Sequence, residues 1–505
     1  MMKNILEYFE KTVRKYQNNV VFEDSDISLK YVEVRKIAIA VGDYIAKMMV
    51  QKKQPILIHM EKSIDCLIAF LGVLYSGNCY VCMDTKMAPE RKKNICKSLE
   101  PAMIITDQIF DIYDETIIIE WKDINKDYSF EKEENINSIV RNIIDTDPAY
   151  ILFTSGSTGI PKGSVILHKS VIAYARWVIE RFNITQDTTF GSQTPFYFSM
   201  SVLDIYATIF SGARLTIIPA KYFSFPIKLI QYLNEKEINT IYWVPSAMAI
   251  VAKWRAFEYE LPRYLNTILF AGEVMPVKQL NRWRKYIPDA LYANLFGPTE
   301  ITDIALYYVV DREFQDSEQL PIGIVADNMD VFVLNDNNEE VSDGEMGELY
   351  FRGSFVGAGY YNNMVATEKH FVQNPLNTKY PEIVYKTGDL VKKEGKYYWY
   401  YGRKDHQIKH MGYRIELGEI EVACNKHPEV ESVACIYIQD ADAIVVYYEG
   451  KVLPDVLRVF IGRYLPGYMM PLEVLQIKHI PLNANGKIDR LQLKSMYVRR
   501  DAYES

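Results

Sequence analysis

The segment Phe153-Thr-Ser-Gly-Ser-Thr-Gly-Ile-Pro-Lys-Gly-Ser164 has the composition of a loop that wraps around phosphate. It combines three glycines and several hydroxyl residues with Lys162, and strand-like apolar runs lie on either side. Glycines let backbone N–H groups approach phosphate oxygens, hydroxyl groups donate further hydrogen bonds, and lysine supplies positive charge. The order differs from that of a Walker P-loop, because no glycine precedes a Gly-Lys-Ser/Thr at the required spacing. Composition alone leaves two interpretations open, a nucleotide site and a flexible turn rich in serine and glycine.

Four further motifs follow this segment along the chain. They are Asn294-Leu-Phe-Gly-Pro-Thr-Glu300, Tyr385-Lys-Thr-Gly-Asp389-Leu, Gly402-Arg-Lys-Asp-His-Gln-Ile-Lys-His-Met-Gly-Tyr-Arg-Ile-Glu-Leu-Gly-Glu-Ile-Glu421 and Pro481-Leu-Asn-Ala-Asn-Gly-Lys487-Ile-Asp-Arg490. Any one of them could arise by chance, but five in the correct order, spread over most of the chain, could not. Together they resemble the adenylate-forming superfamily, which holds acyl-CoA synthetases, luciferases and the adenylation domains of nonribosomal peptide synthesis.

Size, charge and cysteine content exclude several classes of protein. A chain of 505 residues with 49% hydrophobic content exceeds what one core usually organises, so at least two domains are expected. A net charge of -8 argues against nucleic acid or an anionic membrane as the main partner. The six cysteines show no clustering with histidine, so neither zinc nor a disulfide framework is indicated. The start of the chain lacks a cleavable leader, and no apolar run is long enough to cross a membrane. These features indicate a soluble, cytoplasmic protein without membrane insertion.

Strand-like and helix-like segments alternate along much of the chain. Apolar runs at 55–59, 79–83, 102–106 and 150–153 predict strands, and segments 63–76 and 169–182 predict helices. Alternation with short connections favours the α/β class with largely parallel sheets. The glycine-punctuated region 321–359 is typical of shorter strands and turns, which predicts a smaller β subdomain beside the α/β layers.

The resemblance implies two domains. Residues 1–403 would form an N-terminal adenylation core that binds ATP and the acid, and residues 404–505 a smaller, mobile α+β lid domain that carries Lys487. Only 15 residues follow Arg490, too few for a carrier or condensation domain with its own core, so we expect a stand-alone enzyme.

The same resemblance assigns the nucleotide site. Thr154, Ser155, Thr158 and Lys162 would hold the β and γ phosphates, Thr299 the α phosphate and Glu300 a Mg²⁺ ion. Phe296 would stack on adenine, while Asp389 would accept hydrogen bonds from both ribose hydroxyls beside Arg403. Without the motifs, Glu300 would be the start of a helix capped by Thr299, and Asp389 an ordinary turn residue. The full set of expected ATP-binding residues is Thr154, Ser155, Gly156, Thr158, Gly159, Lys162, Gly272, Asn294, Phe296, Gly297, Thr299, Asp389, Tyr400, Arg403 and Lys487.

Lys487 is the residue expected to do most of the catalysis. In isolation a loop lysine is usually solvated surface. In the superfamily, this lysine bridges the substrate carboxylate and the α phosphate, where charge builds up in the transition state. For the second half-reaction the lid is expected to rotate about Asp405, so that Lys409 and Gly412 approach the site and a phosphopantetheine thiol attacks the mixed anhydride. No cysteine is assigned a role.

Three segments are closest to one branch of the superfamily. Thr194-Pro-Phe-Tyr-Phe-Ser-Met-Ser-Val-Leu-Asp-Ile-Tyr206, Phe270-Ala-Gly-Glu-Val-Met275 and 412–417 resemble the family of stand-alone D-alanine:D-alanyl carrier protein ligases. That family has an aspartate at the position of Ser199, where it pairs with the substrate's α-ammonium group. Serine is neutral and shorter, so ammonium recognition at this position is in doubt.

Carrying the family's acid pocket over residue by residue gives a mostly apolar lining with one carboxylate, Asp303. The residues are Ser199, Met200, Leu203, Ser246, Leu269, Ala271, Leu295, Asp303 and Ile304. A buried ammonium group without a counter-charge costs several kcal/mol, so Asp303 could replace the aspartate lost at Ser199, for a shifted amine such as that of a β-amino acid. It could also meet a polar side chain of the substrate. Alternatively, Asp303 could hydrogen-bond the turn after Glu300 and never touch substrate.

Three functions are therefore open. The first, which we favour, is an ATP-dependent ligase that loads a small amino acid onto a separate carrier protein. The second is a CoA ligase or carrier ligase for an acid without an α-amino group, which Ser199 would suit. The third is a binding protein without catalysis, but the presence of Lys162, Glu300, Asp389, Arg403 and Lys487 argues against it.

Overall fold

The computed structural model describes residues 2–49, 51–113, 115–155, 161–404, 407–439, 441–481 and 488–504. It divides into two compact units. The first comprises Met1–Thr85, Leu99–Leu152 and Gly163–Lys404, and the second Lys86–Ser98, Phe153–Lys162 and Asp405–Ser505. Both combine helices and strands, which confirms the α/β fold class.

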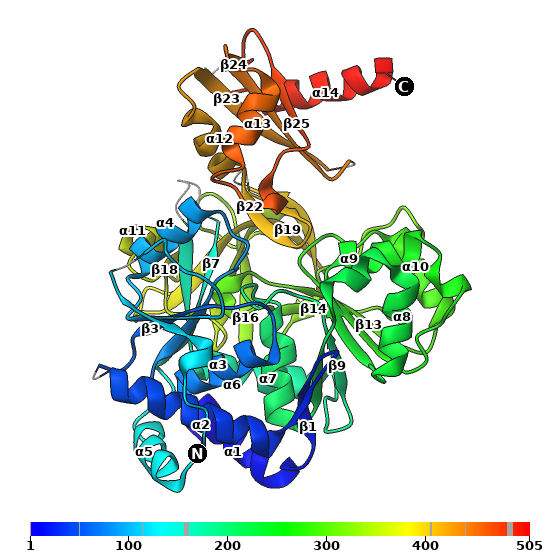
Figure 1. Ribbon diagram of the computed structural model, residues 1–505. Coiled ribbons are helices and arrows are strands. Elements are labelled where there is room, and N and C mark those ends of the chain that lie inside the picture. Colours follow the sequence, from blue (N-terminus) through cyan, green and yellow to red (C-terminus); the bar gives the residue numbers. More distant parts are fainter. Residues whose placement is uncertain are drawn as a thin grey trace. The chain divides into compact units, whose positions relative to one another are not determined.

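A six-stranded sheet contains the predicted strands of the first half of the chain (Figure 1). The described strands follow the order β6 (Ile117–Glu120), β5 (Met103–Thr106), β3 (Pro55–His59), β4 (Cys79–Cys82), β7 (Pro148–Thr154) and β8 (Lys162–Leu167). The pairings from β6 to β7 are parallel. β3 and β4 are buried along their whole length, as expected for parallel strands covered on both faces.

A second sheet has nine strands in the described part of the chain. Its order is β15 (Ile324–Val325), β14 (Leu306–Val309), β13 (Leu291–Phe296), β12 (Thr267–Phe270), β11 (Thr240–Trp243), β9 (Thr189–Ser192), β10 (Arg214–Ile217), β1 (Val20–Glu23) and β2 (Ser28–Lys30). The strands from β13 to β1 are parallel, whereas β2, β14 and β15 are antiparallel to their neighbours. Of the predicted pocket residues, Leu269 and Ala271 lie at the carboxyl end of β12 and Leu295 near that of β13, the usual ligand-binding edge of a parallel sheet. The segment with Ser199, Met200 and Leu203 follows β9, and Ser246 follows β11.

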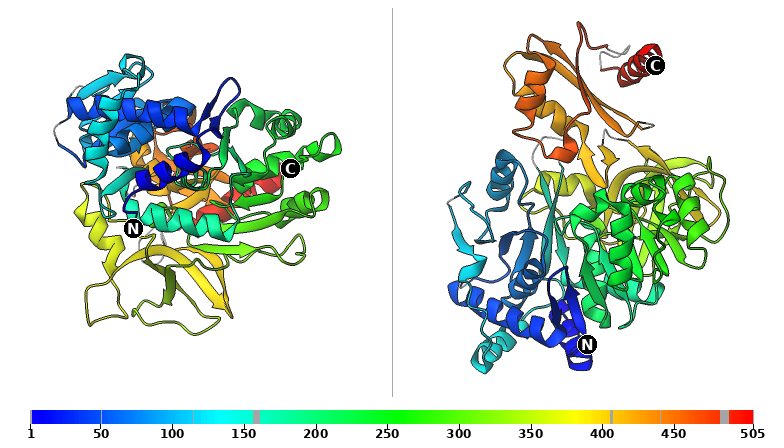
Figure 2. Two further views of the ribbon diagram at one scale, coloured as in Figure 1. Left: turned by 90° about the horizontal axis from the view of Figure 1, so that it is seen from below. Right: turned by 45° about the vertical axis from the view of Figure 1, so that its right-hand side comes forward.

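An antiparallel sheet forms the predicted β subdomain, drawn in yellow-green and yellow in Figure 2. Its strands are β16 (Met329–Leu334), β17 (Met346–Gly353), β18 (Phe371–Gln373), β19 (Ile383–Glu394) and β20 (Tyr397–Arg403). β19 pairs with β17, β18 and β20, and its register sets Asp389 opposite Arg403.

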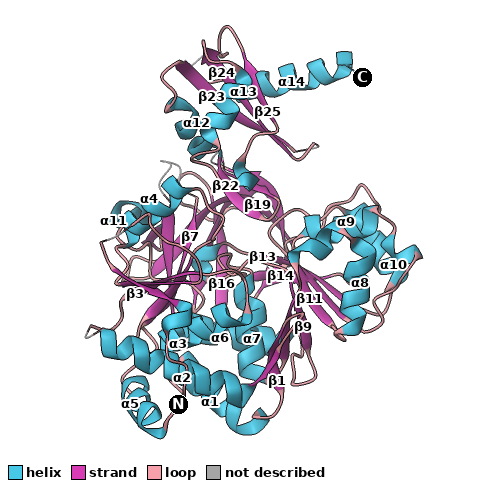
Figure 3. Ribbon diagram, viewed as in Figure 1, coloured by secondary structure: helices cyan, strands magenta, loops and turns pink. Residues whose placement is uncertain are grey.

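The helices of the first unit cover these sheets (Figure 3). They are α1 (Ile5–Tyr16), α2 (Tyr31–Met48), α3 (Ile64–Tyr75), α5 (Phe130–Val140), α6 (His168–Arg181), α7 (Ser201–Ser211), α8 (Pro226–Glu235), α9 (Pro245–Lys253), α10 (Val277–Tyr286) and α11 (Met364–His370). The predicted helix 63–76 is confirmed as α3, because the Ser63 hydroxyl accepts a hydrogen bond from the Cys66 N–H and caps the first turn. One hydrophobic cluster joins residues of both large sheets with α6 and α7.

The second unit has its own core. A three-stranded sheet of β23 (Val430–Ile438), β24 (Ala443–Gly450) and β25 (Glu473–Gln476) is joined by α12 (Leu417–Asn425), α13 (Pro454–Ile461) and α14 (Arg490–Glu504). α4 (Pro89–Leu99) lies almost wholly in this unit. β21 (Gln407–His410) and β22 (Tyr413–Glu416) form a hairpin in which Met411 and Gly412 have φ of 49° and 80°. Two positive φ values are typical of the tight type I′ hairpin turn, which requires a residue such as glycine.

The described cysteines are all buried and unpaired. Cys79 and Cys82 have C-x-x-C spacing, but both lie in β4, where residues three apart point to opposite faces of the sheet. Burial raises the pKa of Cys79 to about 12, so its thiol is unreactive at neutral pH. Within the described part of the chain, no helix is long and apolar enough to cross a membrane.

Candidate active site

The expected ribose-binding pair is brought together across two strands. Arg403 Nη1 donates a hydrogen bond to Asp389 Oδ1 at 2.7 Å, and Arg403 Nη2 donates to the Thr387 carbonyl oxygen at 2.8 Å. Both side chains are almost completely buried. A charge-assisted pair in this setting holds the carboxylate in one orientation, with a second oxygen available to a diol.

The aromatic residue expected to stack on adenine lies at the end of β13. The Phe296 ring centroid is 5.7 Å from that of Tyr400 on β20, with the ring planes inclined by 46°. Asn294 lies on the same strand. Its Nδ2 atom donates to the Pro321 carbonyl oxygen at 2.9 Å and so helps to hold the neighbouring loop. Gly272 has φ of 91°, which favours glycine. A Cβ at Gly297 would approach the Asp303 carbonyl oxygen to 2.4 Å, so no side chain fits there.

Glu300 lies in the single-turn 3₁₀ helix η4 (Thr299–Ile301) and is fully buried. Tyr360 donates its hydroxyl hydrogen to Glu300 Oε1 at 2.6 Å. Thr299 does not cap this turn with its side chain. Instead its hydroxyl donates to the Ser199 hydroxyl at 3.1 Å. This hydrogen bond connects a residue expected at the α phosphate with a residue expected in the acid pocket.

The backbone between Glu300 and Asp303 is strained. Thr302 has φ of 77° and ψ of -61°, and the Asp303 N–H donates to the Ile301 carbonyl oxygen at 3.0 Å. This is the rare γ-turn with positive φ, which is unfavourable for a β-branched residue. Two hydrogen bonds hold it, from Thr302 Oγ1 to the Phe355 carbonyl oxygen at 2.8 Å and from the Tyr150 hydroxyl to the Thr302 carbonyl oxygen at 3.3 Å. A strained backbone conformation of this kind persists only where surrounding contacts hold it in place, and such conformations often occur at functional sites.

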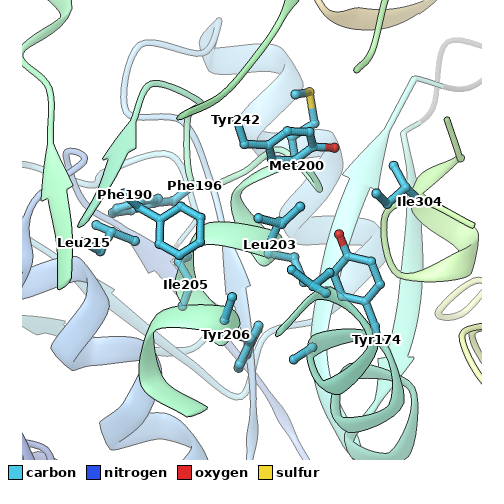
Figure 4. Packing of buried hydrophobic residues seen from close by; sticks show 14 of the residues in the cluster. Tyr174, Phe190, Phe196, Met200, Leu203, Ile205, Tyr206, Leu215, Tyr242 and Ile304 are labelled. Carbon is cyan, nitrogen blue, oxygen red and sulfur yellow. The ribbon is translucent and has the colours of Figure 1, made fainter. Parts of the chain in front are cut away.

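Asp303 is buried among hydroxyl donors. Its Oδ2 atom accepts hydrogen bonds from the Tyr174 hydroxyl at 2.7 Å and from the Tyr242 hydroxyl at 3.1 Å. Burial raises the pKa of Asp303 to about 8, although the two tyrosine hydrogen bonds act in the opposite direction. Figure 4 shows Tyr174 and Tyr242 in one part of the core with Met200, Leu203 and Ile304.

The other expected pocket residues are also buried or nearly so. Ser199 is 8% exposed, and Leu269, Ala271 and Leu295 are almost fully buried. The Ser246 N–H, in the first turn of α9, donates to Glu273 Oε2 at 2.7 Å. This glutamate was not among the residues predicted from sequence.

In the second unit, the predicted phosphate loop is described only in part. Ser155 is buried, and its hydroxyl donates to the Arg414 carbonyl oxygen at 2.7 Å. Thr154 ends β7, and Lys162 begins β8 with 9% exposure. Lys409 lies in β21, and the positive φ of Gly412 in the hairpin turn is by itself a reason for glycine there. Gly156, Thr158, Gly159, Asp405 and Lys487 lie outside the described residues.

An interaction of Lys62 with the end of β9 was missed by the sequence analysis. Lys62 Nζ donates to the Ser192 carbonyl oxygen at 2.9 Å, and its charge interacts with that of Asp204 on α7. Burial lowers the pKa of Lys62 and raises that of Asp204. Tyr174, Tyr242 and Tyr360 were missed as well. Each tyrosine is far in the sequence from the residue it contacts, so no local pattern marked it. Asp204 and Glu273 lie inside quoted motifs and could have been found from them.

The model of the family described as AMP-binding enzyme matches residues 9–361. The chain belongs to this family. The match confirms the resemblance to adenylate-forming enzymes and includes Thr299, Glu300 and Asp303. Asp389 and Arg403 lie beyond the matched region.

The chain is similar to D-alanine–D-alanyl carrier protein ligases of Bacillus cytotoxicus, at 29% identity, and Bacillus cereus, at 28% identity. Each alignment covers 97% of this chain and 99% of the relative.

Solved structures of AMP-binding enzymes share the fold. A nonribosomal peptide synthetase protein containing adenylation and PCP domains has a TM-score of 0.83 at 20% identity, covering 97% of this chain and 84% of that chain. The o-succinylbenzoate CoA synthetase of Bacillus subtilis has a TM-score of 0.82 at 18% identity, covering 97% of this chain and 98% of that chain. Because both match almost equally well, the fold alone does not distinguish a carrier protein from CoA as acceptor.

Proposed function

We propose that this enzyme uses ATP to activate a small amino acid as an acyl-adenylate and then transfers the acyl group to the phosphopantetheine thiol of a separate carrier protein. The observation that supports this most directly is the 3.1 Å hydrogen bond between the Thr299 and Ser199 hydroxyls. Adenylate formation requires a carboxylate to reach the α phosphate, so the nucleotide and acid sites must adjoin. The full-length similarity to D-alanine–D-alanyl carrier protein ligases supports the choice of acid and acceptor.

In the first step, a carboxylate oxygen attacks the α phosphorus of ATP and the bond to pyrophosphate breaks. Asp389, held by Arg403, would accept hydrogen bonds from the ribose hydroxyls, and Phe296 would stack on the base. Thr299 would donate to the α phosphate, and Lys162 would bind the terminal phosphates. Lys487 is proposed to bridge the two reacting anions, and positive charge at that point would stabilise the transition state.

The residues present suit a magnesium ion bound together with ATP. Among the described residues, no group of three or more histidine, cysteine, aspartate or glutamate side chains could hold a metal ion. Mg²⁺ usually binds one or two carboxylates together with substrate phosphates, and Glu300 would be that carboxylate. Tyr360 would fix its orientation through the hydrogen bond to Oε1. When bound, the ion would neutralise phosphate charge.

In the second step, the thiol sulfur attacks the acyl carbon, the bond to AMP breaks, and a thioester forms. We infer that residues 1–403 act as the core and residues 404–505 as a lid that turns about Asp405 between the two steps. This would withdraw Lys487 and present Lys409 and Gly412 to the pantetheine arm.

A second candidate function rests on Ser199. A neutral serine in place of the family's aspartate would suit an acid without an α-amino group, transferred to CoA or to a carrier protein. ATP–pyrophosphate exchange, screened over amino acids and plain carboxylic acids, separates the two candidates. We expect exchange with an amino acid, followed by acyl transfer to a holo carrier protein and little transfer to CoA. Exchange supported best by an acid without an amine would favour the second candidate, and exchange with no acid would refute both.

A further inference from the structure

Asp303 is a buried carboxyl group that has no cationic partner among the described residues. Both of its hydrogen bonds come from neutral tyrosine hydroxyls and end on Oδ2. In the described part of the chain, Oδ1 accepts no hydrogen bond, and no lysine, arginine or histidine forms an ion pair with Asp303. Asp389 has comparable burial, but it is paired with Arg403. A carboxyl group kept in the core without a counter-charge is costly and needs an explanation.

The groups around Asp303 supply no positive charge either. Tyr174 on α6 and Tyr242 on β11 have pKa values raised well above the ordinary range, because burial disfavours the phenolate, so both are donors at neutral pH. Tyr150 on β7 is buried nearby and also stays protonated. Asp204 on α7 acts on Asp303 through its charge, and this repulsion raises the pKa of Asp303 further. Lys62 is engaged with Ser192 and Asp204.

The protein holds Asp303 in place at an energetic cost. The strained γ-turn at Thr302 directly precedes it, and the backbone of Gly297 lies so near this segment that a Cβ there would also approach the Ile304 Cα atom to 2.5 Å. Two long-range tyrosine hydrogen bonds then orient its carboxyl group. Strain and an unpaired acid so close to Glu300 and Thr299 indicate a role in binding rather than in stability.

We propose that Asp303, oriented by Tyr174 and Tyr242, binds the ammonium group of an amine-bearing carboxylic acid, in place of the aspartate that Ser199 has replaced. This assignment rests on the proposed adenylation function and names the chemical class of its substrate. The tyrosine hydroxyls occupy Oδ2, so Oδ1 is the atom that accepts the ammonium hydrogen bond. Asp303 thus determines specificity for a protonated amine and takes no part in phosphoryl transfer.

Recognition of an ammonium group at this site should depend on pH. Asp303 must lose its proton to form the ion pair, and its pKa in the free enzyme is about 8. The affinity for the amine-bearing acid should therefore rise by up to about tenfold per pH unit below pH 8. An aliphatic amine stays protonated over this range. The affinity for the same acid without its amine should not rise with pH in this way.

The test is ATP–pyrophosphate exchange with the best amine-bearing acid and its deaminated analogue, using the full chain. Asp303→Asn should raise KM for the amine-bearing acid by about tenfold or more, without changing KM for ATP or for the analogue. Tyr242→Phe, which keeps the carboxyl group, should give a smaller increase. Asp311→Asn is the matched control, because Asp311 also accepts a tyrosine hydrogen bond, from Tyr308 at 2.7 Å, but is exposed.

The outcomes separate this assignment from the proposed function. If the parent catalyses exchange only with acids that lack an amine, or if Asp303→Asn leaves KM for the amine-bearing acid unchanged, the assignment is wrong while adenylation stands. Absence of exchange with every acid would overturn the adenylation function and this assignment with it. A flat pH dependence of KM for the amine-bearing acid would also count against Asp303.

Discussion

At the scale of single residues, two buried aspartates have opposite surroundings. Asp389 has Arg403 as its partner across β19 and β20, whereas the partners of Asp303 in the described part of the chain are tyrosine hydroxyls. The Arg403 guanidinium group offers Asp389 an ion pair, whereas desolvation among neutral donors raises the pKa of Asp303. The two side chains are therefore suited to different tasks, a fixed acceptor for a neutral diol and a counter-charge for a ligand that brings its own cation.

Replacing Asp303 by asparagine should stabilise the protein. The pKa of Asp303 is raised from 3.8 to about 8 on folding, so its contribution to stability is present below about pH 3.8 and is lost as the pH rises toward 8. Asparagine cannot ionise and avoids this loss, which amounts to as much as about 4 kcal/mol at pH 7. Urea denaturation of the parent and Asp303→Asn at pH 5 and pH 7 checks the prediction. The variant should unfold at a higher urea concentration than the parent, and the difference between their midpoints should be larger at pH 7 than at pH 5. A variant less stable than the parent at both pH values would contradict the prediction.

Lys487→Ala should nearly abolish adenylate formation but spare thioester formation from chemically supplied acyl-adenylate. The proposed role of Lys487 exists only where the carboxylate meets the α phosphate, so the second step does not need it. Pyrophosphate exchange measures the first step, and transfer from synthetic acyl-adenylate to a holo carrier protein measures the second. Equal loss in both assays would refute the separation and point to a folding defect or a shared role.

At the scale of secondary-structure elements, turns and strand pairing place the side chains expected to bind substrates. The register of β19 and β20 sets Asp389 opposite Arg403, and the γ-turn at Thr302 sets Asp303 beside β11 and α6. In the second unit, the tight turn between β21 and β22 brings Gly412 to a hairpin tip. Each of these positions depends on backbone geometry that only a few residue types tolerate.

Asp405→Pro should leave adenylation active while carrier loading falls. Asp405 directly follows Lys404, where the first unit ends, and proline would lock its φ near about -65° and restrict a rotation there. Pyrophosphate exchange and carrier loading are to be compared in the same preparation, with Asp405→Ala, which leaves φ unrestricted, as the matched control. Unimpaired carrier loading in Asp405→Pro would mean that the pivot lies elsewhere, with Lys404 as the next residue to test.

At the scale of the whole molecule, the Lys62 side chain connects the two large sheets of the first unit. Lys62 follows β3 of the six-stranded sheet and hydrogen-bonds Ser192 at the end of β9 in the nine-stranded sheet, while Asp204 approaches from α7. The hydrogen bond therefore helps to hold the end of β9, where the loop to α7 that carries Ser199 and Met200 begins.

Stability of the whole chain should fall in mild acid because of His168. This residue begins α6, is buried, and accepts a hydrogen bond from the Ile5 N–H through Nδ1 at 3.3 Å, so it is neutral in the folded state. Burial lowers its pKa from 6.5 to about 4. Its contribution to stability is therefore present above about pH 6.5 and is lost as the pH falls toward 4, by about 3 kcal/mol in total.

The comparison that checks this is urea denaturation of the parent and His168→Asn between pH 4.5 and 7.5. Asparagine keeps an acceptor near the position of Nδ1 but does not titrate in this range. The variant should lose less stability than the parent on acidification. If the stabilities of the parent and the variant fell equally with pH, groups other than His168 would cause the acid sensitivity.

The sequence alone determined the fold class, the family and the identity of the nucleotide-site residues, because these depend on short-range patterns. Strand and helix periodicity, and motifs such as Asn294–Glu300, are read within a few residues of each other. The partners of those residues depended on tertiary structure. Tyr174 and Tyr242 lie 129 and 61 residues from Asp303, and only the packing of α6 and β11 brings them to it. Tertiary structure also decided the charge of Asp303, since desolvation by the surrounding core, which no local pattern encodes, sets whether a buried acid keeps its proton.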